Sequence, residues 1–168
     1  SARTAFKDGK PGCRGDWQEA ARRGDYREAV DSVSRMNLAG LLTHSRSDDL
    51  VLLGDAARLA GRFDMAERAY GTVRKRLPGQ GCATAAALAM GRMAFDGLRD
   101  YQKSRHWLEI YLNEAKGSSL DREIMGRLME ARHKSGGIEE ARKTASEYLT
   151  RYPHGPHADL AEELLGKR

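Results

Sequence analysis

Long apolar runs are missing from this sequence. An alanine-rich stretch, CATAAALAM at residues 82–90, stops at Gly91 and Arg92. A membrane-spanning helix needs roughly 18 to 20 consecutive apolar residues. We therefore expect no membrane span in the chain as given, and any membrane association only through a segment that precedes Ser1.

Catalytic motifs are missing as well. The sequence contains no HExxH, GxSxG, GxGxxG or P-loop pattern, and no acid, base and nucleophile lie together in a specific context. The HGPH stretch places His154 and His157 three residues apart. We interpret them as polar residues at a helix start rather than as metal ligands. The sequence therefore predicts a non-enzymatic protein without a cofactor or a metal site.

Cysteine is scarce. The two cysteines, Cys13 and Cys82, lie in the glycine-containing stretches PGCRGD and GQGCAT, each just before a predicted helix. No CxxC pattern is present, and no histidine is near either cysteine in sequence, which argues against a zinc site. Two interpretations stay open, because sequence does not determine the Cα separation that a bridge needs. One is a disulfide formed in an oxidising periplasm, and the other is two unrelated small residues near turns.

Outside the basic cluster RKR at 74–76, which falls in the last turn of a predicted helix, no part of the predicted helices has a large excess of one charge. The 29 basic and 24 acidic residues give a net charge of +5, and the two signs are interspersed along the helical segments. The other exception is residues 1–15, which we interpret as a basic N-terminal arm rich in glycine and proline; its charged residues are Arg3, Lys7, Asp8, Lys10 and Arg14. A phosphate-binding stripe needs denser basic residues on one face. We therefore predict no nucleic-acid partner.

An internal repeat is the strongest pattern in the chain, and repeats should be sought before single elements. Four stretches share a glycine-containing turn followed by an alanine-rich helix: RRGDYREAV at 22–30, LAGRFDMAERAY at 59–70, FDGLRDYQKSRHWL at 95–108 and KSGGIEEARKTA at 134–145. The small residue after each turn is Ala29, Ala66, Ser104 and Ala141, so successive copies are 37, 38 and 37 residues apart. This near-constant period predicts a repeat architecture.

Each repeat reads as two amphipathic helices around a turn. In the second copy, apolar residues follow helical spacing on both sides of Gly61. The same reading along the chain predicts an all-α domain over residues 16–168. The expected helices span 16–23, 26–36, 48–60, 64–77, 83–96, 101–115, 119–134, 138–151 and 157–166. Residues 37–47 fit either a short helix or a long connection.

These residues resemble the tetratricopeptide-repeat family. The second copy carries the closest likeness in Leu53, Gly54, Gly61, Phe63, Ala66, Tyr70 and Pro78, and the fourth in Gly136, Ile138, Ala141, Tyr148 and Pro153. The third departs by one extra residue around 97–100 and by Ser104 at the small position, and the first keeps only Trp17, Ala20 and Ala21 in its leading helix. The resemblance implies a right-handed superhelical array of antiparallel helix pairs, a TPR-like α-solenoid with about four repeats and a C-terminal capping helix.

The last segment, EYLTRYPHGPHADLAEELLG at 147–166, is similar to repeat ends of bacterial envelope tetratricopeptide proteins, among them the outer-membrane-assembly lipoprotein and the Tol-Pal-associated type. It also looks like the repeat tails of some membrane-bound regulators. The resemblance implies a protein–protein interaction scaffold that is periplasmic or associated with the outer membrane, with a cytoplasmic location as the alternative. A sensing domain of an anti-sigma-like regulator and an accessory domain that binds a small molecule or glycan are the other functions considered.

Arrays of helix pairs bind extended peptides or partner helices on the inner face formed by the first helix of each pair. If the resemblance holds, this face binds a protein partner, either a peptide or a helix. Its expected residues are Asp48, Val51, Asp55 and Arg58 from the second repeat, Leu88, Arg92 and Phe95 from the third, and Glu123, Glu130 and His133 from the fourth.

Overall fold

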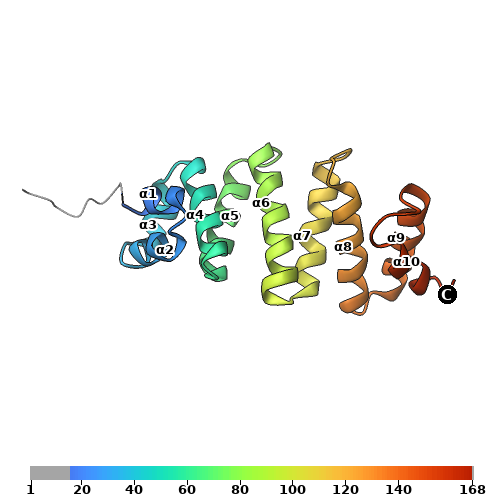
Figure 1. Ribbon diagram of the computed structural model, residues 1–168. Helices are drawn as coiled ribbons and strands as arrows, with labels where there is room; N and C mark the ends of the chain where they lie inside the picture. Colours follow the sequence, from blue (N-terminus) through green and yellow to red (C-terminus); the bar gives the residue numbers. More distant parts are fainter. Residues whose placement is uncertain (1–15, 168) are drawn as a thin grey trace, which may run out of the picture. The chain divides into compact units, whose positions relative to one another are not determined.

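The computed structural model describes residues 16–167, and these residues form helices joined by turns (Figure 1). Consecutive helices pack in adjacent pairs, an arrangement consistent with an α-solenoid. None of the described residues lies in a β-strand. The prediction of an all-helical chain is therefore confirmed for this part of the sequence, while the arm predicted over residues 1–15 lies outside it.

The described residues divide into two compact units, the first ending at Ala69 and the second beginning at Tyr70. The division falls within α5 (Phe63–Arg76). Before α5, the first unit contains α1 (Asp16–Arg23), α2 (Tyr26–Ser34), α3 (Leu38–His44) and α4 (Ser47–Leu59). Helix α1 packs against α2 and α4, and α2 also packs against α4. Alanine and branched aliphatic residues fill this core, so the helices approach closely; its buried members include Ala20, Ala29, Val30, Val33, Leu50, Leu53 and Ala57.

Helix α3 settles the ambiguous stretch at 37–47 in favour of a short helix. The Asn37 side chain accepts a hydrogen bond from the backbone N–H of Gly40 at 3.1 Å, which satisfies one of the unpaired donors of the first turn. Leu42 is buried and anchors the helix in the unit. A seven-residue helix is too short to be stable alone, so this element depends on its cap and its packing.

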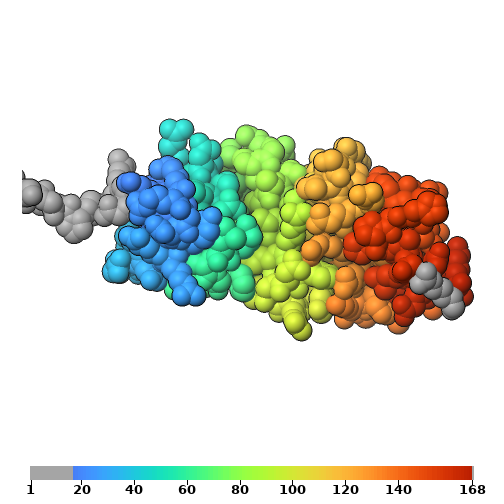
Figure 2. Space-filling model, in the orientation of Figure 1, coloured from blue at the N-terminus to red at the C-terminus, as the bar shows by residue number. Residues whose placement is uncertain are grey.

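The second unit continues from α5 through α6 (Gly81–Arg92), η1 (Met93–Leu98), α7 (Tyr101–Glu114), α8 (Asp121–Lys134), α9 (Ile138–Arg151) and α10 (Ala158–Leu164). Helices α6 to α10 pack in chain order, and the yellow-to-red surface in Figure 2 follows the same succession from α7. One hydrophobic cluster joins α6, α7 and α8 through Ala87, Leu108, Tyr111, Ile124 and Leu128. A second joins α8, α9 and α10 through Met125, Met129, Ala145, Tyr148 and Ala161.

The helix ends agree with the predicted ones to within two residues, except in the third pair. There, α6 ends at Arg92 and the chain continues as the π-helical segment η1. A π-helix takes up an additional residue by bonding each amide one residue further back. The extra residue noted in the third repeat is therefore absorbed inside the helix, and Arg99 then turns the chain in the left-handed conformation at φ 53°.

Ser104, the unusual small residue of the third repeat, has a role in the same pair. Its side chain is fully buried, and its hydroxyl donates a hydrogen bond to the carbonyl of Gly91 at 3.0 Å. Gly91 lies just before η1, where the change in backbone bonding begins. A buried carbonyl needs a donor, so serine at this position holds α7 against the helix whose hydrogen-bond pattern changes.

Candidate functional site

The residues predicted for the binding face fall in both units. In the first unit, the four predicted residues occupy α4 at spacings of three and four, which places them along one side of that helix; they are Asp48, Val51, Asp55 and Arg58. Asp48 is exposed, and the other three are partly buried. The Asp55 carboxylate lies 3.8 Å from the Arg58 guanidinium, so this side of α4 carries a loose ion pair.

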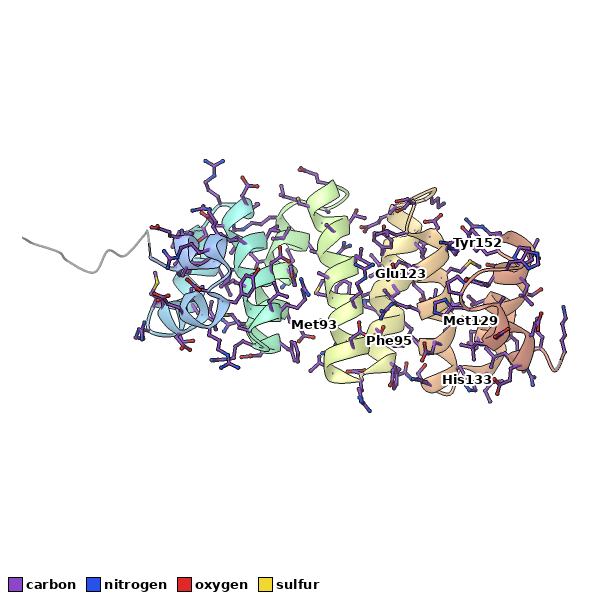
Figure 3. The ribbon with its side chains drawn as sticks, viewed as in Figure 1. Met93, Phe95, Glu123, Met129, His133 and Tyr152 are labelled. Atoms are coloured by element: carbon purple, nitrogen blue, oxygen red, sulfur yellow. The ribbon has the colours of Figure 1, made fainter. Side chains whose placement is uncertain are left out.

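In the second unit, the structure brings four of the six predicted residues, Arg92, Phe95, Glu123 and Glu130, into one connected group. Phe95 lies in η1 and Glu123 lies on the neighbouring helix α8, as the side-chain view shows (Figure 3). The Arg92 Nη2 atom donates a hydrogen bond to Glu123 Oε1 at 2.9 Å. Helices that are far apart in sequence therefore present these side chains together.

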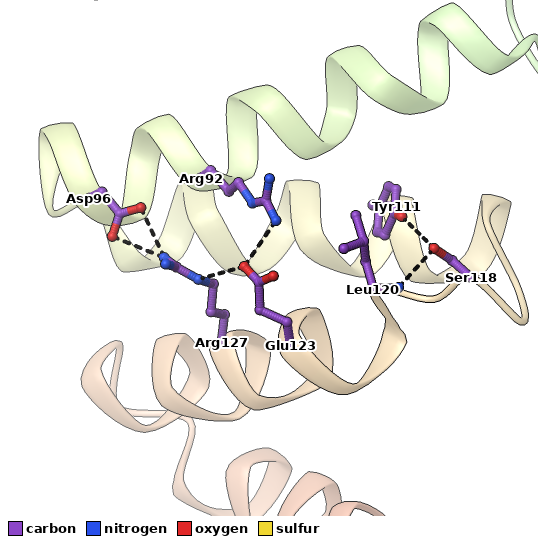
Figure 4. Close-up of polar contacts among 7 residues, drawn as sticks. All are labelled: Arg92, Asp96, Tyr111, Ser118, Leu120, Glu123 and Arg127. Carbon is purple, nitrogen blue, oxygen red and sulfur yellow. Dashed lines mark hydrogen bonds and ion pairs between the residues drawn. The ribbon is translucent and has the colours of Figure 1, made fainter. Parts of the chain in front are cut away.

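A charge network extends this group (Figure 4). Arg127 Nη1 donates to both carboxylate oxygens of Asp96 at 2.9 Å, and Arg127 Nε lies 3.4 Å from Glu123 Oε1. Arg127 thus joins α8 to η1, while Glu123 receives two guanidinium groups. The side chains of Arg92 and Glu123 keep 37% and 42% of their surface exposed, so the network is open to solvent and to a partner.

An aromatic pair lies beside the network. The rings of Phe95 and Tyr101 meet edge to face, with centroids 5.3 Å apart. The Arg127 guanidinium lies 5.3 Å from the Phe95 ring centre, and the Lys134 ammonium lies 5.6 Å from Phe95 and 5.0 Å from Tyr101. Such cation–π contacts add attraction to that of the ion pairs.

Glu130 belongs to the group through Lys134. Its Oε1 atom lies 2.8 Å from Lys134 Nζ, and this hydrogen bond raises the pKa of the lysine above its ordinary value. We define the charged aromatic face by all of these residues: Arg92, Phe95, Asp96, Tyr101, Glu123, Arg127, Glu130 and Lys134.

The other two predicted residues of this unit are placed differently. Leu88 is partly buried and packs against the cluster shared by α6, α7 and α8, so much of its surface serves the core. His133 is exposed in the last turn of α8. Neither side chain has a hydrogen bond or an ion pair to the charged aromatic face within the described residues.

Sequence reasoning missed four members of this face, and only some were detectable. Glu123 and Arg127, like Glu130 and Lys134, are four residues apart on one helix, a spacing that favours ion pairs. The sequence carried that signal. Asp96 and Tyr101 carried none, because their placement depends on η1 and on the turn that follows it.

His157 lies at a helix start as predicted, at the N-cap of α10, but its side chain is partly buried and packs into the fourth pair. A methyl group at Gly126 would overlap the His157 imidazole, whose Nδ1 is buried without a hydrogen-bond partner among the described residues. Burial lowers the pKa of this imidazole below 6.5; Arg127 lowers it further, and Glu130 and Glu123 oppose the shift. His154, in contrast, is exposed.

The described residues contain no group of three or more histidine, cysteine, aspartate or glutamate side chains arranged to hold a metal ion. Cys82 is partly buried in the first turn of α6, and Cys13, its possible disulfide partner, lies outside the described residues. In the described part of the chain, no helix combines the length and the apolarity that crossing a membrane requires.

The fold and the face together define a class, an all-helical protein of paired helices with a preorganised polar and aromatic surface on its second unit. Comparison with known proteins adds no family: no protein-family model matches the chain, and no curated protein matches it.

Proposed function

We propose that this protein is a non-enzymatic protein–protein interaction scaffold, a tetratricopeptide-type α-solenoid of right-handed, antiparallel helix pairs with a C-terminal capping helix. A partner peptide or helix binds in its concave groove. Helices packed in adjacent pairs support this proposal, as does the 37- to 38-residue period of the sequence. Arrays of this kind use their extended inner surface for binding.

The charged aromatic face is the observation that carries the proposal. Arginine and tyrosine are enriched among the residues that dominate binding energies at interfaces. Here Arg92, Arg127 and Tyr101 are held by contacts from neighbouring helices before any partner arrives. Preorganisation reduces the side-chain entropy that association costs, so this face is suited to binding.

The charge balance of the face favours a protein over a nucleic acid. Arg92 and Arg127 already contact Glu123, and Arg127 also binds Asp96. Nucleic-acid binding draws its affinity from basic groups that neutralise phosphates, and carboxylates among those groups would repel the phosphates. A protein partner with both charges and an apolar side chain complements this surface better.

The location we propose is the bacterial cell envelope, either the periplasm or the outer membrane. It is supported by the likeness of residues 147–166 to the repeat ends of bacterial envelope tetratricopeptide proteins. A disulfide between Cys13 and Cys82 belongs to the same proposal, because an oxidising compartment would allow it.

Crosslinking in cells of the source organism, followed by purification of the bound proteins, tests the proposal. The variant Arg92→Ala with Phe95→Ala removes one guanidinium and one apolar side chain from the face. The matched control, Arg122→Ala with Ile138→Ala, removes the same kinds of group from exposed positions outside it. We expect the first variant to keep its helicity and to recover at least tenfold less partner. The reason is that truncating a central interface residue costs about 2 kcal/mol or more of binding free energy.

The control variant should retain the partner. Equal retention by both variants, or loss in the control alone, would contradict binding at this face. Recovery of no protein partner with either variant or with the unaltered chain would contradict the scaffold function itself.

A further inference from the structure

A cavity of about 480 Å³ lies in the second unit between α7, α8 and α9. It shares no residue with the charged aromatic face, so it is independent of the scaffold proposal. Its volume lies within the range of about 300 to 1,000 Å³ that is usual for small-molecule sites. Leu112, Met125 and Leu128 supply apolar surface, and both signs of charge line the rest.

Asp121, in the first turn of α8, is a buried carboxylate of this cavity, with 7% of its surface exposed. Its Oδ2 atom accepts hydrogen bonds from the backbone N–H of Gly117 at 3.2 Å and from Arg151 Nη2 at 3.4 Å. Its Oδ1 atom is buried and has no hydrogen-bond partner among the described residues. Oδ2 therefore holds the connection between α7 and α8. Oδ1 lacks the hydrogen-bond donor that a buried polar atom needs.

Two arginines of the cavity differ in how firmly they are held. Arg132 contacts Glu109 Oε1 through Nε at 3.2 Å and Nη2 at 3.0 Å, and its Nη1 donates to Thr144 Oγ1 at 2.5 Å. Arg151 has the long contact to Asp121, one of 3.8 Å to the Met125 sulfur and a cation–π contact with its guanidinium carbon 5.1 Å from the Tyr152 ring centre, none of them a short hydrogen bond, and half of its side chain is exposed. Arg151 is therefore the guanidinium that can move to meet a ligand.

A ligand with a single charge fits this lining poorly. An anion bound at Arg151 would lie beside the Asp121 carboxylate, and a cation bound at Asp121 would lie beside the Arg151 guanidinium. A molecule that carries an ammonium and a carboxylate on one carbon presents both charges a few Å apart and satisfies both groups. The apolar residues of the cavity can then accept an aliphatic side chain.

We propose that this cavity binds a free α-amino acid with an apolar side chain. Arg151 turns on its exposed side to admit the ligand, and this movement uncovers the Asp121 carboxylate. The ligand ammonium then donates to Asp121 Oδ1, and the ligand carboxylate accepts from Arg151. Leu112, Met125 and Leu128 contact the aliphatic part. Arg132 stays bound to Glu109 and Thr144 and forms a fixed wall.

Titration of the ¹⁵N-labelled chain with L-leucine, followed by NMR, tests this proposal. We expect saturable shifts of the Gly117 and Asp121 amides and of the Arg151 Nε–H. N-acetyl-L-leucine lacks the ammonium and L-leucinamide lacks the carboxylate, so each should bind at least tenfold more weakly. Equal binding of either analogue, or no saturable shift with leucine, would overturn the proposal.

Two variants locate the site. Asp121→Asn and Arg151→Gln should each weaken leucine binding at least tenfold, whereas Arg122→Gln, one residue away and exposed, should leave it unchanged. If Asp121→Asn fails to fold, Arg151→Gln still decides the outcome, because its side chain is half exposed. Unchanged binding in Arg151→Gln would place leucine elsewhere and overturn the assignment.

Discussion

The third helix pair, α6 and α7, and the fourth, α8 and α9, both lie in the second unit. The connections between their helices have different backbone conformations. Between α8 and α9, Gly136 turns the chain at φ 86°, where glycine has no steric cost. Between α6 and α7, the π-helical segment η1 comes first, and Arg99 turns the chain at φ 53°. One extra residue in the third pair is thus accommodated inside its first helix, and the second helix still packs in sequence.

The second helices of these pairs each bury a small residue near their start, but the two residues differ in hydrogen bonding. Ser104 and Ala141 are equivalent small residues, and both are fully buried. Only Ser104 donates a hydrogen bond to the preceding helix, at the Gly91 carbonyl. The comparison shows that a polar residue can occupy this core position of the repeat when it donates a hydrogen bond to a carbonyl of the facing helix.

The helix ends also correspond. Tyr111 and Tyr148 lie seven residues after those small residues, and each hydroxyl holds the chain that follows its helix. Tyr111 shares a hydrogen bond of 3.0 Å with the Ser118 hydroxyl, which in turn accepts from the Leu120 N–H at 3.1 Å (Figure 4). Tyr148 accepts from the His157 N–H at 3.2 Å. One tyrosine thereby supports the next pair, and the other supports the C-terminal segment.

We expect the largest effect from Tyr148→Ala, which removes a fully buried ring from the cluster of α8, α9 and α10. The free energy of unfolding should fall by about 3 to 5 kcal/mol, as for other large-to-small core changes. Urea denaturation measures it. Tyr148→Phe keeps the ring and should lose only about 1 kcal/mol; equal losses in the two variants would show that the hydroxyl, and not the ring, stabilises this end.

A smaller loss should follow Ser104→Ala in the third pair. It leaves the buried Gly91 carbonyl without this donor, at a cost of about 1 to 3 kcal/mol. The exposed Ser119→Ala serves as the control and should change stability by less than about 0.5 kcal/mol. A Ser104→Ala protein as stable as this control would contradict the role of the serine hydroxyl beside η1.

Substitutions at the two turn residues should change stability in opposite directions. Gly136→Ala forces a side chain into the left-handed region and should cost about 1 kcal/mol. Arg99→Gly removes that strain, and because glycine loses more entropy on folding, the net gain should be about 0.5 to 1 kcal/mol. Thermal unfolding of both variants measures this. Destabilisation by Arg99→Gly would mean that the arginine side chain stabilises the turn.

The smallest effect should come from lowering the pH. We expect it to reduce the free energy of unfolding through His157, at the end of the fourth pair. Burial lowers the folded-state pKa of His157 below 6.5, so near and below that pH the unfolded chain binds this proton more readily than the folded one. The contribution of His157 is therefore constant above its unfolded pKa, and stability falls as the pH drops through it.

Denaturant unfolding of the unaltered chain and of His157→Gln at about pH 7.5 and about pH 5 isolates this contribution. The variant should lose less stability on acidification than the unaltered chain. The same loss in both proteins would argue against His157 as the acid-sensitive group.

The sequence predicts only part of the charged aromatic face. The pairs Glu123 with Arg127 and Glu130 with Lys134 are local, so helical spacing alone brings them together. The ion pairs Arg92 with Glu123 and Asp96 with Arg127 each join residues 31 positions apart. No sequence pattern specifies those contacts, because they depend on how α8 packs beside α6 and η1.

The sequence by itself determined the helices, because amphipathic spacing and glycine turns act over a few residues and repeat at a steady period. The small residues that mark its period, Ala29, Ala66, Ser104 and Ala141, all prove to be buried. Tertiary structure alone decided that η1 absorbs the extra residue, that His157 packs on Gly126, and that Asp121 and Arg151 meet in a cavity. Those outcomes depend on contacts between helices, where packing outweighs the preferences of any single segment.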